Sequence, residues 1–94
     1  MKNSQIPGLI KKLNRMPGVY AIKLHGSAYG KAGTPDVLCV VNGQAYLFEV
    51  KQPGEAPTAI QAVEMARWTA AGAVVSVIYS ADDVLRLVSS SSIP

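Results

Sequence analysis

An Asn-Gly dipeptide at residues 42–43 separates two apolar runs, VLCVV at 37–41 and AYLFEV at 45–50. Asn-Gly between apolar runs is the strongest short-range signal for a β-hairpin with a two-residue turn, because both residues tolerate positive φ. Such a turn also sets the pairing of the two strands. The sequence therefore predicts an antiparallel hairpin whose register can be counted from its tip.

Counting back from the turn, Val37 faces Phe48 and Asp36 faces Glu49. Directly opposed residues share one face of a sheet, with Cβ atoms about 4.5–5.5 Å apart. Lys51 lies two residues past Glu49 and projects from the same face. Because two opposed carboxylates repel each other unless a cation intervenes, we expect a cation between them.

These three side chains indicate hydrolytic metal chemistry. Mg²⁺ takes oxygen ligands and uses one or two carboxylates while it keeps several waters. A neighbouring lysine orients or deprotonates a water, or stabilises developing charge. Phosphodiester hydrolysis needs these parts. The alternative on the same residues is that Asp36 caps a turn after Pro35, while Glu49 and Lys51 form an exposed pair.

The rest of the chain shows helical and strand patterns in alternation. We expect one domain over residues 1–94 with the order α-β-β-β-α-β-α, a central mixed β-sheet flanked by helices. The expected elements beside the hairpin are a helix at 4–15 capped by Ser4, a strand at 19–24, a helix at 58–71 opened by a Thr58–Gln61 capping box, a strand at 74–80 that is buried on both faces, a helix from Ser80, and a frayed tail at 89–94.

The whole chain carries a formal net charge of +3, and its basic residues are concentrated in the first third. Residues 1–35 hold six Lys or Arg and no acid, whereas residues 36–94 hold six acids and three Lys or Arg. This distribution fits either a polyanion-binding surface or a solvated helix face. The candidates for contact with nucleic acid are Lys11, Lys12, Arg15, Lys23, His25 and Lys31.

Several classes of protein are excluded by what the sequence lacks. The one cysteine, Cys39, has no companion for a disulfide or a zinc site, and the one histidine, His25, excludes a histidine-based nuclease site. No apolar run reaches the roughly 18–20 residues that span a bilayer, so we expect no membrane partner. No apolar signal-peptide core is present near the N-terminus, and a cytoplasmic location is expected.

The sequence GTPD at 33–36, followed by EVK at 49–51, resembles the PD-(D/E)xK nuclease superfamily. The glycine-rich lead-in, EVKQPG, the helical Gln61 and AAGAVVSVIYSADD are more closely similar to its VRR-NUC branch, over about residues 4–88. The resemblance implies a restriction-endonuclease-like core and a DNA endonuclease that depends on Mg²⁺ or Mn²⁺. It further implies selectivity for branched or junction DNA and a homodimer.

The resemblance also implies roles for single residues. Asp36 and Glu49 would bind the metal, the carbonyl of Val50 would be a further ligand, and Lys51 would be the catalytic lysine. Gln61 resembles the glutamine of the family that reaches the active site from the helix after the motif, and it equally fits the cap of that helix.

The chain departs from the family pattern at its first helix, where the family usually carries a glutamate that completes the metal site. No acid precedes Asp36, and Gln5 stands near the comparable position. A one-metal site with a glutamine ligand, a natural variant of reduced activity and an engineered Glu→Gln change all fit this departure. Two other functions therefore stay open beside the nuclease: a nuclease-like fold that holds DNA without cutting it, and a purely structural α/β domain.

Overall fold

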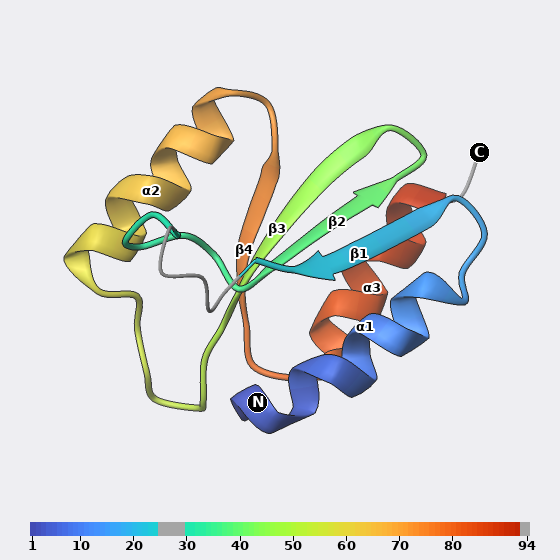
Figure 1. Ribbon diagram of the computed structural model, residues 1–94, viewed down its shortest axis with the longest axis horizontal. Helices are drawn as coiled ribbons and strands as arrows, with labels where there is room; N and C mark the ends of the chain where they lie inside the picture. The colour runs from blue at the N-terminus through green and yellow to red at the C-terminus, as the bar shows by residue number, and fades with distance from the viewer. Residues whose placement is uncertain (25–29, 93–94) are drawn as a thin grey trace.

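A four-stranded mixed sheet forms the centre of the fold (Figure 1). The computed structural model describes residues 1–24 and 30–92, with side chains to residue 89. The strands of the sheet stand in the order β1 (Val19–Lys23), β2 (Val37–Val41), β3 (Gln44–Val50) and β4 (Val74–Ile78). The first three strands are antiparallel neighbours, and β4 lies parallel to β3 at the far edge.

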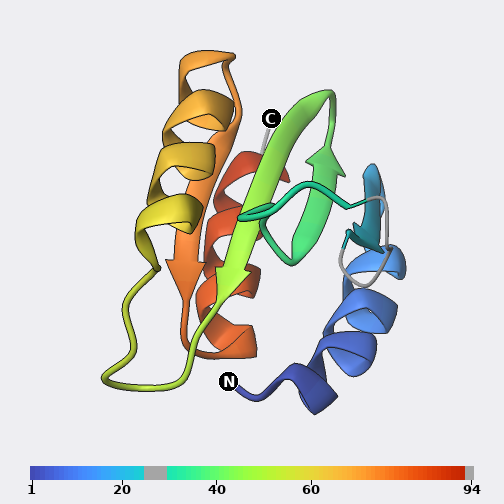
Figure 2. The ribbon, with the colours of Figure 1, turned by 60° about the vertical axis from the view of Figure 1, so that its left-hand side comes forward.

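The helices lie on both faces of this sheet. A 3₁₀ turn, η1 (Asn3–Gln5), leads into α1 (Ile6–Asn14), and the later helices are α2 (Ala59–Ala70) and α3 (Ala81–Ser92). Helices α1 and α3 pack on one face with the main core, whereas α2 lies on the other face, in front of β4 (Figure 2). The expected fold class and element order are therefore confirmed.

The hairpin has the predicted register over β2 and β3. Val41 pairs with Gln44 and Val37 with Phe48, and the turn residues Asn42 and Gly43 have φ values of 48° and 87°. Positive φ at both positions is the backbone that a tight hairpin turn requires, and Asn and Gly adopt it at low cost.

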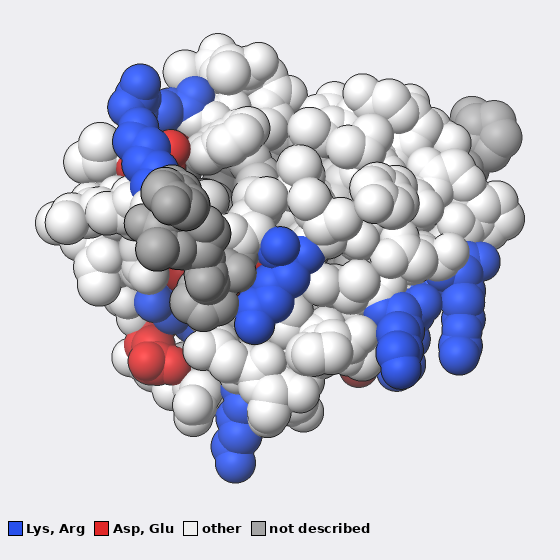
Figure 3. Space-filling view, viewed as in Figure 1, with Lys and Arg blue, Asp and Glu red and all other residues white. Residues whose placement is uncertain are grey.

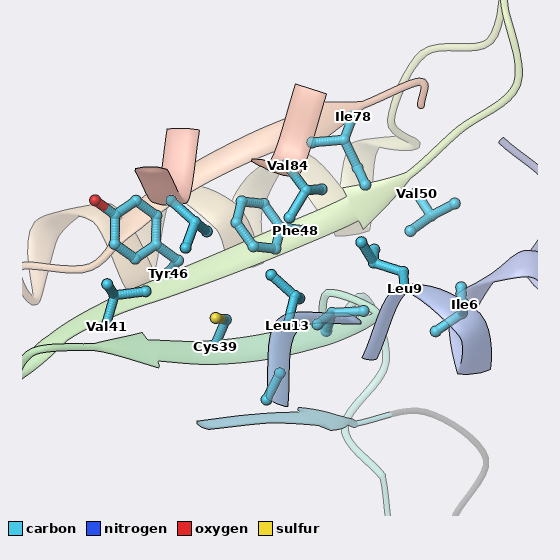
Figure 4. Packing of buried hydrophobic residues seen from close by; sticks show 13 residues of the cluster. Ile6, Leu9, Leu13, Cys39, Val41, Tyr46, Phe48, Val50, Ile78 and Val84 are labelled. Atoms are coloured by element: carbon cyan, nitrogen blue, oxygen red, sulfur yellow. The ribbon is translucent and has the colours of Figure 1, made fainter. Parts of the chain in front are cut away.

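The core lies between the sheet and the α1–α3 layer (Figure 4). Phe48 and Leu13 are fully buried in it, together with Val84 and Val88 of α3. Cys39 is buried there too, where it packs as a small apolar residue, and burial raises the pKa of its thiol to about 11.

The free edge of β1 is covered by a side chain of α1. The Asn14 amide donates to the carbonyl oxygen of Ala21 at 3.0 Å, and its oxygen accepts from the N–H of Ala21 at 2.8 Å. This side chain replaces the backbone partner that an edge strand lacks, so the edge is closed to another strand at this point.

Three expectations about the elements were wrong. Ser4 is not the N-cap of the first helix, because the 3₁₀ turn places Lys2 and Gln5 at the two cap positions. The strand from Val74 is an edge strand, and among its five residues only Ile78 is buried. Residues 89–92 continue α3 as helix, and residues 93–94 of the expected tail lie outside the described part. No helix in the described part of the chain is long and apolar enough to cross a membrane.

Candidate functional site

Asp36 is fixed where the chain enters β2. Its N–H donates to the carbonyl oxygen of Phe48 at 3.0 Å, and its own carbonyl accepts from the N–H of Leu24 at 2.8 Å. Its Oδ2 accepts from the N–H of Val50 at 2.8 Å. The preceding Pro35 is buried. Backbone and side chain of Asp36 are therefore both tied to the end of β3.

The predicted opposition of Asp36 and Glu49 was wrong in its detail. Val37 pairs with Phe48, and the N–H of Asp36 also turns to the Phe48 carbonyl, so two residues of one strand oppose one of the other. This is a β-bulge, which shifts Asp36 out of the regular ladder. The carboxyl groups of Asp36 and Glu49 nevertheless lie close enough to share a hydrogen bond.

Glu49 lies near the end of β3 and is only 3% exposed. Its Oε1 is 3.7 Å from the Nζ of Lys51, whereas its Oε2 is buried without a hydrogen-bond partner in the described part of the chain. Burial and the neighbouring Asp36 carboxylate raise the pKa of Glu49 from 4.5 to about 7, and the Lys51 ammonium acts in the opposite direction.

Lys51 is the first residue after β3, and its side chain is 13% exposed. Its N–H donates to the carbonyl oxygen of Ile78 at 3.0 Å, which extends the pairing of β3 with β4. The structure therefore brings together the three side chains that the hairpin predicted, Asp36, Glu49 and Lys51, at one end of the sheet.

The donor set of this site fits a hard divalent cation. A buried, unpartnered carboxylate oxygen beside a second carboxylate is costly, and a cation between them would relieve that cost. Among the described residues no group of three or more His, Cys, Asp or Glu side chains could hold a metal. Two carboxylates with waters and neutral oxygens are a set that Mg²⁺ accepts.

Gln5 does not contact these carboxylates. Its Oε1 accepts from the N–H of Lys2 at 2.8 Å within η1. The residue lines an open hollow of about 570 Å³ between α1 and the start of α3, which Lys12 and Tyr79 also line and Asp36 and Glu49 do not. A role for Gln5 as a metal ligand would require its side chain to leave Lys2.

Gln61 completes the predicted capping box of α2. Its Oε1 accepts from the N–H of Thr58 at 2.9 Å, and its N–H donates to the Thr58 Oγ1 at 3.3 Å. Of the two roles that the sequence left open, the cap is the one present in this structure. The amide of Gln61 reaches no described residue of the Asp36–Glu49 site.

The basic candidates lie in different surroundings (Figure 3). The side chain of Lys31 forms an ion pair with Glu64, with 3.2 Å between Nζ and Oε2. His25 lies outside the described residues. The remaining candidates are exposed on α1, on the turn after it and at the end of β1: Lys11, Lys12, Arg15 and Lys23.

Sequence reasoning missed Glu64, the one buried residue of α2. Its carboxylate binds Lys31 and so ties α2 to the segment that carries Asp36. Gly33 of that segment lies so close to α2 that a Cβ added there would be 2.6 Å from a side-chain atom of Ile60. An acid on the helical stripe that contains Gln61 and Trp68 is the sequence signal that marks Glu64.

No protein-family model matches the chain, and no curated protein matches it. A solved structure described as a VRR_NUC domain does match, with a TM-score of 0.71 and 28% sequence identity. The match covers 92% of this chain and 92% of that chain. The chain therefore has the fold of the VRR-NUC family, and the likeness extends over nearly its whole length.

Proposed function

We propose that this chain, which has the VRR-NUC fold, is a metal-dependent DNA endonuclease that hydrolyses phosphodiester bonds in branched or junction DNA in the cytoplasm. The observation that carries the proposal is the close pair of carboxyl groups of buried Glu49 and half-buried Asp36, with one Glu49 oxygen unpartnered among the described residues and Lys51 beside it. A nuclease-type fold supports the same activity.

The residues at the end of β3 would hold Mg²⁺ or Mn²⁺. Asp36 and Glu49 supply the charged oxygens. The Val50 carbonyl is proposed as a further ligand because Val50 follows Glu49 in the chain and its N–H donates to Asp36 Oδ2. Gln5 is proposed as a neutral ligand that reaches the site only after it releases Lys2. When bound, the metal would polarise a phosphoryl oxygen and lower the pKa of a water.

Lys51 places a positive charge where the reaction develops negative charge. Its ammonium lies 3.7 Å from Glu49 Oε1 and is largely shielded from solvent. In that position it can orient the attacking water or stabilise the phosphorane-like oxygens, and shielding strengthens both effects. Gln61 is proposed to assist from α2, which requires its amide to leave the Thr58 cap.

DNA is proposed to bind to the exposed lysine and arginine side chains in the first third of the chain. Lys11, Lys12 and Arg15 would contact phosphates, which position a duplex without reading its sequence. We further propose a homodimer, because a two-fold pair of sites presents two active centres to two of the strands of a junction.

A second candidate function is a nuclease-like protein that binds DNA without cutting it. The observation that favours it is the lack of an acid before Asp36, which leaves two carboxylates at the site. Such a protein would show salt-dependent DNA binding but no metal-dependent cleavage.

The test compares wild type with Lys51→Ala on flapped, bubbled and four-way DNA in Mg²⁺ or Mn²⁺. The matched control is Gln52→Ala, which truncates the exposed neighbouring residue. We expect cleavage by wild type and the control, and a loss of about 100-fold or more in Lys51→Ala. Equal cleavage by all three proteins would disprove the assignment of Lys51. Binding without cleavage by wild type would establish the second candidate.

A further inference from the structure

Among the described residues, no helix or loop covers the part of the sheet around β1 on the face that carries α2. The exposed apolar residues there are Tyr20, which is 68% exposed, and Ile22, which is 37% exposed, both on β1. Their neighbours on β2, Leu38 and Val40, are half-buried. We call these four residues the open sheet face. Helix α2 leaves the open sheet face free because α2 lies over β4, at the edge of the sheet opposite to β1 (Figure 2).

The open sheet face continues to the candidate metal site. Ile22 pairs with Leu38 and Leu38 with Leu47, so these three residues form one cross-strand row. Glu49 lies two residues beyond Leu47 and therefore on the same face. Tyr20 belongs to the next row, which lies on the side of the Ile22–Leu38–Leu47 row away from Glu49. With about 6.8 Å between rows and about 4.8 Å between strands, Tyr20 lies roughly 16 Å from Glu49 along the sheet.

The charges around this face suit an anionic partner. Neither β1 nor β2 contains an acid, and Lys23 ends β1 beside Ile22. Of the acids on the α2 side of the sheet, Glu49 and Glu64 are buried and Asp36 is half-buried, whereas Glu55, in the loop before α2, is exposed. Lys31 is more than half exposed even in its ion pair. An apolar, aromatic surface bordered by lysines combines the two features that bind single-stranded nucleic acid.

We propose that the open sheet face binds unpaired nucleotides of the DNA substrate, with Tyr20 stacking on a base. This inference rests on the proposed nuclease function, and it adds to the candidate metal site a contact for the single-stranded arm of a branched DNA. An aromatic ring accepts any base, so the contact selects single-stranded character and not sequence. At about 3.4 Å per stacked nucleotide, the separation of roughly 16 Å corresponds to about five nucleotides between the scissile phosphate and Tyr20.

The experiment measures binding in EDTA, so that no strand is cut. Forked DNAs with unpaired arms of two to eight nucleotides, with 2-aminopurine at each arm position in turn, are titrated with wild type, Tyr20→Ala and Tyr20→Phe. The matched control is Ile60→Ala, which truncates a similarly exposed apolar residue on α2. We expect Tyr20→Ala to weaken binding of arms longer than five nucleotides about tenfold and to leave two-nucleotide arms unchanged. Tyr20→Phe and Ile60→Ala should bind as wild type does.

The outcomes separate this inference from the proposed function. If wild type cuts branched DNA and Tyr20→Ala binds long arms as tightly as wild type, the open sheet face has no such role, while the nuclease assignment stands. If wild type neither binds nor cuts any DNA, both fail. If Tyr20→Ala converts a dimer to a monomer in light scattering, the face is a contact between copies and the inference is overturned.

Discussion

The Oε1 of Glu49 lies 3.7 Å from the Nζ of Lys51, while the Oε2 of the same buried carboxylate meets no described hydrogen-bond donor. A stable protein usually satisfies a buried carboxylate on both oxygens, because an unpaired buried acceptor costs about 1–3 kcal/mol. Here the neighbouring Asp36 carboxylate raises the cost of the charged Glu49 further. This arrangement is understandable if the site exists for a cation and not for the stability of the fold.

The metal-free protein should lose stability as the pH rises from about 4.5 to about 7. The raised pKa of Glu49 means that the folded state holds a proton that the unfolded chain has already released. The contribution of Glu49 to the free energy of unfolding is therefore fully present below pH 4.5. On the order of 2–3 kcal/mol of it is lost by pH 7. The measurement is the free energy of unfolding in urea with EDTA, taken as wild type minus Glu49→Gln. A difference that does not change across this window would contradict it.

Asp36→Asn should weaken metal binding without unfolding the protein. The asparagine oxygen can still accept from the N–H of Val50, but the site loses one of its two carboxylates. We expect the affinity for Mn²⁺ to fall about 10- to 100-fold in calorimetry at pH 8. The pKa of Glu49 should fall as well, because Asp36 is one cause of its rise. A variant that binds Mn²⁺ as wild type does would exclude Asp36 as a ligand.

Gln5→Glu should strengthen metal binding if Gln5 is a ligand. A carboxylate at this position restores the acid that the family usually has on its first helix, and we expect about tenfold tighter Mn²⁺ binding. Gln5→Ala, which removes the oxygen that accepts from Lys2, is the paired variant. It should weaken Mn²⁺ binding in the same calorimetry. If both variants bind Mn²⁺ as wild type does, Gln5 is only a cap of η1.

Local signals explain which features could be predicted from the sequence. Asn42 and Gly43 fix the hairpin through their own backbone angles, so the pairing from Val37 to Val41 followed from two residues. The cap of α2 likewise depends on Thr58 and Gln61, which are three positions apart. The approximate meeting of Asp36 and Glu49 followed from the same hairpin.

Features that depend on distant contacts could not be predicted in this way. The bulge at Asp36 arises where the chain arrives from the segment bound to α2, and no local pattern specifies it. The Lys31–Glu64 pair joins residues 33 positions apart in the sequence. The exposure of β4 depends on its place at the sheet edge, which an apolar run alone does not reveal.

Gly33→Ala should disturb the metal site through the segment that carries Asp36. Gly33 has a φ of +83°, and an added Cβ would lie 2.6 Å from a side-chain atom and 2.7 Å from the backbone oxygen of Ile60. Backbone cannot yield as a flexible side chain can, so the segment must move away from α2. We expect a loss of about 2–3 kcal/mol in the free energy of unfolding and several-fold weaker Mn²⁺ binding.

Gly54→Ala is the matched control for this prediction. Gly54 has nearly the same φ, +86°, but a Cβ there would meet nothing within 4 Å. It should therefore show only the cost of the backbone conformation, about 1–2 kcal/mol, and unchanged Mn²⁺ binding. The difference between the two variants isolates the contact with Ile60. Equal losses of stability, with equal affinities for Mn²⁺, would show that the position of the segment against α2 does not matter to the site.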